Sequence, residues 1–152
     1  ELPGNIALRI YGGGNPSYAA SLKRLAHGDS RIRFCGQRPA DQMVEAYQNA
    51  DCIVVPSMWY ETYNFVLREA LACGCIGIVS NLGAMKEVIT EGENGFMFDA
   101  GNLLSLQEAM EKAMAFDWTD YRQMEFPKLK DESEQYLRLY QQAVAHRSHA
   151  GH

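Results

Sequence analysis

Short apolar runs alternate with amphipathic segments along most of the chain. Runs rich in β-branched and aromatic residues predict strands, and these lie at 6–11, 32–35, 52–55, 76–80 and 96–98. Apolar positions at helical spacing predict helices near 18–26, from 39 onward, and near 64–73, 85–89, 103–115 and 130–145. Strands separated by helices are typical of parallel βαβ units. The pattern therefore predicts an α/β fold, with an open, mostly parallel sheet and helices on both of its faces.

Two of these helices have an apolar side that we expect to be buried. In the helix that starts at Pro39, the apolar residues are Met43, Val44, Ala46 and Tyr47. In the helix at 103–115, they are Leu103, Leu106, Met110 and Ala113. The helix at 64–73 is apolar on most of its circumference, which predicts that it is buried.

Two glutamates lie on either side of the start of this last helix. Glu61 is in the loop that follows strand 52–55, and Glu69 is on the helix itself. Buried carboxylates are rare unless they are paired or hydrogen-bonded, so the pair is a candidate site for a polar ligand. The alternatives are a solvated loop residue for Glu61 and a structural ion pair with Arg38 or Lys86 for Glu69.

The composition is that of one ordinary globular domain. The chain has 152 residues, 47% hydrophobic and 22% charged, and we assign 1–146 to the domain and 147–152 to a disordered tail. A net charge of -5 with no basic stripe argues against nucleic-acid binding. No apolar run approaches the roughly 20 residues of a membrane span, and the first residues lack signal-peptide features. We therefore expect a cytoplasmic location, or attachment to the inner membrane face in a full-length parent.

The cysteines and histidines do not suggest a metal site. Cys73 and Cys75 are too close together for zinc, and we expect all four cysteines to be free thiols in a reducing compartment. Three histidines recur at every third position near the end of the chain. They could form a helical metal face, but a frayed terminus is the simpler interpretation.

In an open parallel sheet, ligands bind beyond the carboxyl ends of the strands. This rule selects the loops at 12–15, 36–38, 57–64 and 81–84. The helix that begins near Asn64 offers free N–H groups and a positive dipole end to a phosphate. The turn formed by Gly12, Gly13 and Gly14 could let the backbone approach a ligand, or could simply be a tight turn.

A series of motifs along the chain has the order and spacing of one known family. The motifs are Pro56-Ser57, the Glu-x7-Glu pair of Glu61 and Glu69, and the segments 69–74, 80–89 and 92–95. They resemble the family 4 glycosyltransferases of GT-B fold, specifically their carboxyl-terminal, nucleotide-sugar-binding domain. This resemblance runs from the strand that ends at Gly12 to about Ala115, and more loosely through the last predicted helix. It implies a Rossmann-like domain that forms one half of a GT-B enzyme.

The resemblance also implies roles for individual residues. Glu61 would lie against the donor sugar as the catalytic, electrostatic residue, and Glu69 would accept hydrogen bonds from the ribose. The remaining expected donor-binding residues are Gly12, Gly13 and Gly14 on the phosphate side, Gln37 and Arg38 near the base, and Thr62, Tyr63, Asn64 and Phe65 around the diphosphate. The family transfers sugar with retention of configuration and needs no metal, so no cofactor is expected beyond the nucleotide-sugar co-substrate. The acceptor would be a saccharide, a lipid or a small molecule.

The chain departs from the family pattern at several positions. Thr62 and Asn64 stand where glycine is common, Ile76 where proline is usual, and 81–84 replaces a double glycine. Two other readings therefore stay open: a Rossmann-like module that binds without catalysis, and another GT-B activity such as a nucleotide-sugar epimerase.

The amino end also departs from the family. The chain starts near what resembles the end of the family's first helix, so we expect a fragment without the first strand–helix unit, its phosphate clamp and the amino-terminal domain. For the same reason we expect this fragment alone to be inactive. The absent strand would be central, which predicts either two unpaired sheet edges or a rearranged strand order. Unpaired edges favour self-association.

Overall fold

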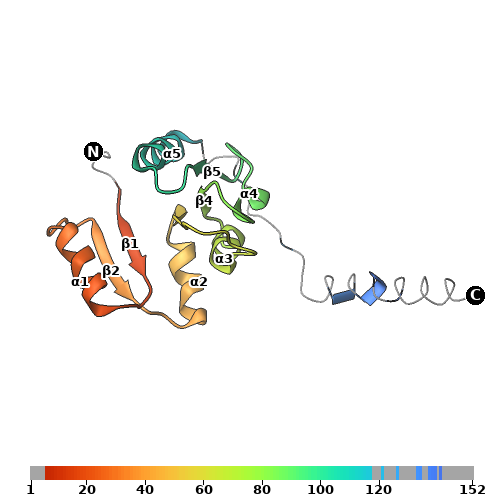
Figure 1. The fold of residues 1–152 in the computed structure, drawn as a ribbon, viewed down its shortest axis with the longest axis horizontal. Helices are drawn as coiled ribbons and strands as arrows, with labels where there is room; N and C mark the ends of the chain where they lie inside the picture. Colours follow the sequence, from red (N-terminus) through yellow and green to blue (C-terminus); the bar gives the residue numbers. More distant parts are fainter. Residues whose placement is uncertain are drawn as a thin grey trace, which may run out of the picture.

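The computed structural model describes residues 6–117 together with 121, 126, 133, 134, 137–139 and 141. Its elements in chain order are β1 (Leu8–Tyr11), α1 (Pro16–Leu25), β2 (Ile32–Gly36), α2 (Ala40–Gln48), β3 (Cys52–Val55), α3 (Phe65–Ala72), β4 (Ile76–Ser80), α4 (Met85–Val88), β5 (Gly95–Phe98) and α5 (Leu103–Ala115) (Figure 1). Strands and helices alternate throughout this range, which confirms the α/β prediction. Of the helix predicted at 130–145, the described residues are helical. The segment 147–152 lies outside the described residues, so the predicted tail stays a prediction.

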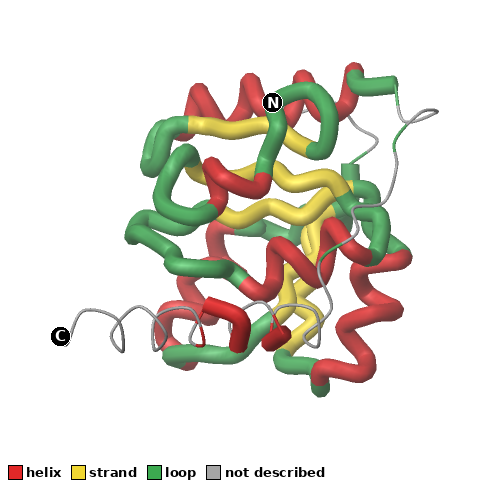
Figure 2. Tube along the Cα trace, turned by 90° about the vertical axis from the view of Figure 1, so that its right-hand side faces the viewer, coloured by secondary structure: helices red, strands yellow, loops and turns green. Residues whose placement is uncertain are grey.

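The strands form two parallel sheets instead of one. One sheet has the order β1-β2 and the other the order β3-β4-β5. In Figure 1, α2 lies between the β1-β2 sheet, which has α1 on its outer side, and α3 of the other sheet, and the strands form two separate groups (Figure 2). Among the described residues, neither β1 nor β3 has a strand on its second side. Of the two arrangements predicted from the sequence, this is the one with unpaired edges.

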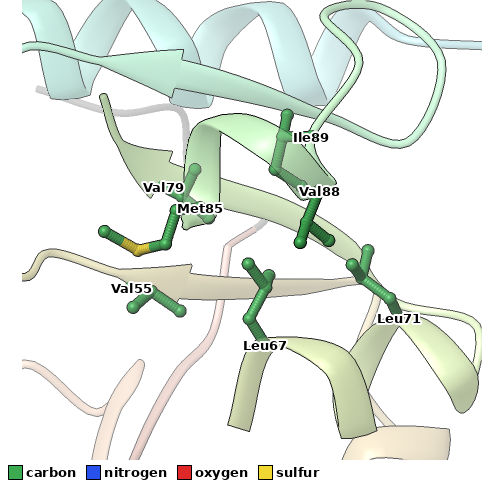
Figure 3. Close-up of a cluster of buried hydrophobic side chains, with 7 residues drawn as sticks. All are labelled: Val55, Leu67, Leu71, Val79, Met85, Val88 and Ile89. Atoms are coloured by element: carbon green, nitrogen blue, oxygen red, sulfur yellow. The ribbon is translucent and has the colours of Figure 1, made fainter. Parts of the chain in front are cut away.

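The larger sheet is covered on both faces, as predicted. Side chains alternate between faces along a strand, so Val79 of β4 faces α3 and α4, whereas Ile76 and Ile78 face α5. The first face is filled by Val55, Leu67, Leu71, Val79, Met85, Val88 and Ile89 (Figure 3). The second is filled by Ile76, Ile78, Phe96, Phe98, Ala109 and Ala113.

Burial differs from the prediction at two helix positions. Val44 of α2 is 46% exposed and Leu103 of α5 is 80% exposed. In α2 the buried residue is Tyr47, which packs against Ala70 of α3, so the helix buries a narrower stripe than its apolar pattern suggests. In α5 the apolar contact with the sheet begins only at Leu106, one turn after Leu103.

The four cysteines are free thiols, as expected, and Cys75 is fully buried. Within the described part of the chain, no helix is long and apolar enough to cross a membrane. The expected cellular location stays a prediction.

Candidate functional site

The junction between β3 and α3 is shaped by the backbone of Asn64. This residue has φ 53° and ψ 83°, a left-handed conformation in which glycine and asparagine are the most common residues. Its side-chain oxygen accepts a hydrogen bond from the N–H of Leu67 at 2.9 Å and so caps α3. Asn64 therefore adopts a backbone conformation that suits glycine and adds a cap that glycine could not supply.

The carboxylate of Glu61 is held from within the same loop. The hydroxyl of Ser57 donates a hydrogen bond to Glu61 Oε1 at 2.8 Å. Ser57 is buried and Glu61 is half-buried. The Glu61 side chain is therefore oriented by a buried partner, and it is not a freely solvated loop residue.

The turn at 81–84 packs against the loop that contains Glu61. The N–H of Ala84 donates to the Glu61 carbonyl oxygen at 2.9 Å. Gly83 has φ +53°, and a Cβ added there would lie 2.5 Å from the Glu61 oxygen and 2.9 Å from the Glu61 nitrogen. Glycine is thus required at position 83 both for its backbone conformation and for the closeness of the two loops.

A cleft of about 380 Å³ opens at this junction. It is lined by Val54, Val55, Pro56, Ser57, Glu61, Asn64, Phe65 and Val66. The first N–H groups of a helix have no partner inside the helix, so the start of α3 presents donors and a positive dipole end to this cleft. Three of the predicted residues, Glu61, Asn64 and Phe65, meet here.

Thr62 and Tyr63 lie in the same loop and are exposed. The Tyr63 carbonyl accepts a hydrogen bond from Arg68 Nε at 3.1 Å, and the Arg68 guanidinium lies 4.1 Å from the centre of the Tyr63 ring. Arg68, which the sequence did not single out, thereby fixes the loop against the first turns of α3.

Glu69 occupies a different environment from the one predicted. Its side chain is exposed, because α3 is buried only along Leu67, Ala70 and Leu71 while Phe65 and Val66 are 70% and 49% exposed. The prediction of a buried helix and a buried carboxylate is therefore wrong.

Neither of the structural ion pairs considered for Glu69 forms among the described residues. The partner of Glu69 is instead the phenol of Tyr47, which donates to Glu69 Oε2 at 3.2 Å. Burial, reinforced by the Glu69 carboxylate, raises the pKa of Tyr47 to about 12. Tyr47 and Ser57 were both missed as site residues, because their contacts with the two glutamates depend on tertiary packing.

The glycine turn and Gln37 lie together at the carboxyl ends of β1 and β2. Gly12 donates its N–H to the Gly36 carbonyl at 2.9 Å, and a Cβ at Gly13 would lie 3.3 Å from Gln37 Oε1. Around Gly12 and Gly14 the space where a Cβ would stand is open. This geometry suits both a tight turn and a turn that meets a ligand.

Arg38 lines a second cleft, of about 460 Å³. The residues around it are Arg9, Tyr11, Arg38, Gln42, Glu45, Ala46 and Asn49. Most of the predicted site residues thus fall into two groups, one at the carboxyl ends of β1 and β2 and one at the β3–α3 junction, and the two clefts share no lining residue. Glu69, farther along α3, lines neither cleft. Within the described residues, no group of three histidine, cysteine or acidic side chains is placed to hold a metal ion.

Comparison with known proteins gives one consistent family. The family model described as glycosyl transferases group 1 matches residues 2–115. The chain is 30% identical over 119 residues to the D-inositol 3-phosphate glycosyltransferase of Corynebacterium diphtheriae, covering 74% of this chain and 28% of that protein. It is 34% identical over 107 residues to the phosphatidyl-myo-inositol mannosyltransferase of Mycobacterium leprae, covering 70% of this chain and 28% of that protein.

Two solved structures show the same fold. Anabaena HepE in complex with UDP matches with a TM-score of 0.64 and 22% identity, over 74% of this chain and 32% of that one. Sucrose-phosphate synthase from Thermosynechococcus elongatus matches with a TM-score of 0.70 and 24% identity, over 91% of this chain and 38% of that one. The chain therefore spans between a quarter and two fifths of the length of these proteins.

Proposed function

The chain belongs to the glycosyl transferases group 1 family, and from this premise we propose that it provides the nucleotide-sugar-binding part of a retaining glycosyltransferase. The observation that carries the proposal is the cleft at the β3–α3 junction, where the Glu61 carboxylate and the amino end of α3 lie side by side. A carboxylate suits a sugar hydroxyl or a developing positive charge, whereas free N–H groups suit a diphosphate.

The chemistry follows from charge that develops during transfer. When the bond between sugar and diphosphate breaks, the diphosphate leaving group gains negative charge, and prearranged N–H groups stabilise it. The N–H groups at Asn64, Phe65 and Val66 are the candidates for this role, with the Thr62–Tyr63 backbone beside them. Glu61, oriented by Ser57, would contact the donor sugar and stabilise its reacting carbon electrostatically.

The rest of the donor would extend toward the other predicted residues. In this proposal Glu69 accepts hydrogen bonds from the ribose hydroxyls, Gln37 and Arg38 approach the base, and the turn at 12–14 lines the phosphate side. No metal is required, because backbone donors and the helix dipole provide the positive potential.

The donor class is supported by the neighbours. The HepE structures are complexes with UDP and with UDP-glucose, and a neighbour from Arabidopsis, starch synthase IV, is bound to ADP and acarbose. We therefore propose a nucleoside-diphosphate sugar as donor. The acceptor would be a saccharide, a lipid or a small molecule, and relatives named for inositol phosphate and phosphatidyl-inositol make an inositol-containing acceptor the first one to test.

The departures from the family pattern do not favour the reading of a non-catalytic module. Asn64 keeps the left-handed backbone conformation, and Ile76 is fully buried in the core of the larger sheet, where it packs toward α5. Thr62 is exposed and is not among the residues that line the cleft.

The test is calorimetric titration of the full-length protein with UDP-, GDP- and ADP-sugars and with the corresponding diphosphates. We expect one nucleotide series to bind. Glu61→Gln should weaken the binding of the nucleotide-sugar by up to about tenfold and leave the affinity for the diphosphate unchanged. Glu93→Gln, in the exposed turn before β5, is the matched control. If no series binds, the proposed donor class is wrong. Turnover is to be assayed on the full-length protein with an inositol phosphate as the first acceptor.

A further inference from the structure

Tyr47 combines a buried ring with a hydroxyl that contacts Glu69. It lies in the last turn of α2 and is only 5% exposed. Its ring packs in a small cluster with Ala70 of α3 and with Cys75, which directly precedes β4. A ring confined in this way keeps its hydroxyl in one place, so the position of the phenol oxygen is set by the packing of α2 against α3.

The hydroxyl of Tyr47 meets one oxygen of Glu69 at a distance of 3.2 Å. Glu69 is exposed, and a solvated glutamate would normally sample several side-chain orientations. Among the described residues, the donor that holds this carboxylate is the Tyr47 phenol, and no cation pairs with it.

The chemistry of this contact suits a ligand-binding carboxylate. A phenol donates one hydrogen bond to one carboxylate oxygen and adds no charge, so the other oxygen of Glu69 is left to accept from vicinal hydroxyls. Burial keeps the phenol protonated, since the pKa of Tyr47 is raised to about 12. Tyr47 is therefore a donor at every pH at which the protein would work.

We infer that Tyr47 is a positioning residue for Glu69, and that its hydroxyl holds the carboxylate in the orientation that accepts the ribose hydroxyls of the donor nucleotide. The inference rests on the proposed function, in which Glu69 is the ribose anchor. The competing account is structural: the same hydrogen bond would only tie α2 to α3, with no effect on which nucleotide binds.

The experiment compares UDP with 2′,3′-dideoxy-UDP, which lacks the hydroxyls that Glu69 would bind. Both are titrated against the full-length protein, as wild type and as the Tyr47→Phe and Glu69→Gln variants, by ligand-observed nuclear magnetic resonance, with ADP and GDP and their dideoxy forms as the alternative series. We expect Tyr47→Phe to lower the affinity for UDP by between about twofold and tenfold and to leave the affinity for dideoxy-UDP unchanged. Combined with Glu69→Gln, the tyrosine substitution should have little further effect, because both remove the same contact.

Tyr121→Phe is the matched control. The Tyr121 hydroxyl donates to the Cys75 carbonyl at 2.8 Å, so this variant also loses one phenol hydrogen bond but leaves Glu69 untouched. It should bind UDP as the wild type does.

Three results would overturn the inference, and they can be told apart. Equal weakening of UDP and dideoxy-UDP by Tyr47→Phe would show that the bond is structural, and unchanged binding of both would show that Glu69 needs no positioning. If the wild-type full-length protein bound no nucleotide in any series, the proposed function would fail first and the inference with it.

Discussion

The replacement of Gly83 by alanine tests whether the turn at 81–84 supports the Glu61 loop. Gly83 has φ +53°, so any other residue is strained there. A new Cβ would also lie 2.5 Å from the Glu61 carbonyl oxygen and 2.9 Å from its nitrogen. Both are backbone atoms, and no change of side-chain rotamer can relieve the overlap.

The expected magnitude is the sum of these two effects. A left-handed backbone costs an alanine about 1–2 kcal/mol. Forcing atoms into a packed region costs about 1–3 kcal/mol more. Gly83→Ala should therefore lower the free energy of unfolding by about 2–5 kcal/mol, and it should move the Glu61 loop away from the turn.

Gly92→Ala separates the two effects. Gly92 has φ +77°, but no atom lies within 4 Å of the position its Cβ would take. This variant carries the backbone strain alone, so in urea denaturation it should lose about 1–3 kcal/mol less than Gly83→Ala. In calorimetric titration, Gly83→Ala should also bind the nucleotide-sugar more weakly than Gly92→Ala does. Equal losses of stability and equal binding by the two variants would refute the argument that the two loops are in close contact.

Three further predictions concern the helix cap, alkaline stability and association. In the same urea assay, Asn64→Ala should lower the free energy of unfolding by about 1 kcal/mol for the lost cap and by about 1 kcal/mol for the left-handed backbone. Asn64→Gly should lower it by only about 0.3 kcal/mol. Equal losses in the two variants would contradict the observed cap. The pKa of Tyr47 is raised from 10.0 to about 12 and that of Cys52 from 9.0 to about 12, so unfolding releases protons at high pH. The contribution of these two groups to the free energy of unfolding should therefore be fully present below pH 9 and should be lost as the pH rises toward 12. In thermal melts, Tyr47→Phe should make the loss of stability between pH 10 and 12 less steep. The same pH dependence in the wild type and the variant would contradict the raised pKa of Tyr47. Finally, the unpaired edges of β1 and β3 should make the chain self-associate, so sedimentation should show a mean mass that rises with concentration; one monomeric mass at every concentration would exclude this.

Local features of the sequence were sufficient to predict most of the elements. Strand β4 was predicted with the bounds it has in the structure, because it is a short continuous run of apolar or small residues with clear ends, the pattern of a parallel strand buried on both faces. The cap at Asn64 was also predictable, since a capping side chain acts within its own helix. The meeting of Glu61, Asn64 and Phe65 in one cleft follows from their place at a single strand–helix junction.

Contacts between separate elements could not be predicted in this way. The exposure of Glu69 depends on which side of α3 packs on the sheet, and an apolar pattern around most of the helix does not decide that side. The bond from Tyr47 to Glu69 needs α2 beside α3, across 22 residues of chain. The close approach of Gly83 to Glu61 likewise joins two loops that are unrelated in local sequence.

The sequence by itself determined the order of strands and helices, the family, and the candidate residues at the carboxyl ends of the strands. These depend on periodicity, turn chemistry and motif spacing, which act over a few residues. Only the tertiary structure decided that the strands form two sheets, that β1 and β3 keep unpaired edges, and that Ser57 and Tyr47 hold the two glutamates. The physical reason is that pairing and packing are set by which surfaces meet, and a local pattern shows that a surface is apolar or polar without showing what lies against it.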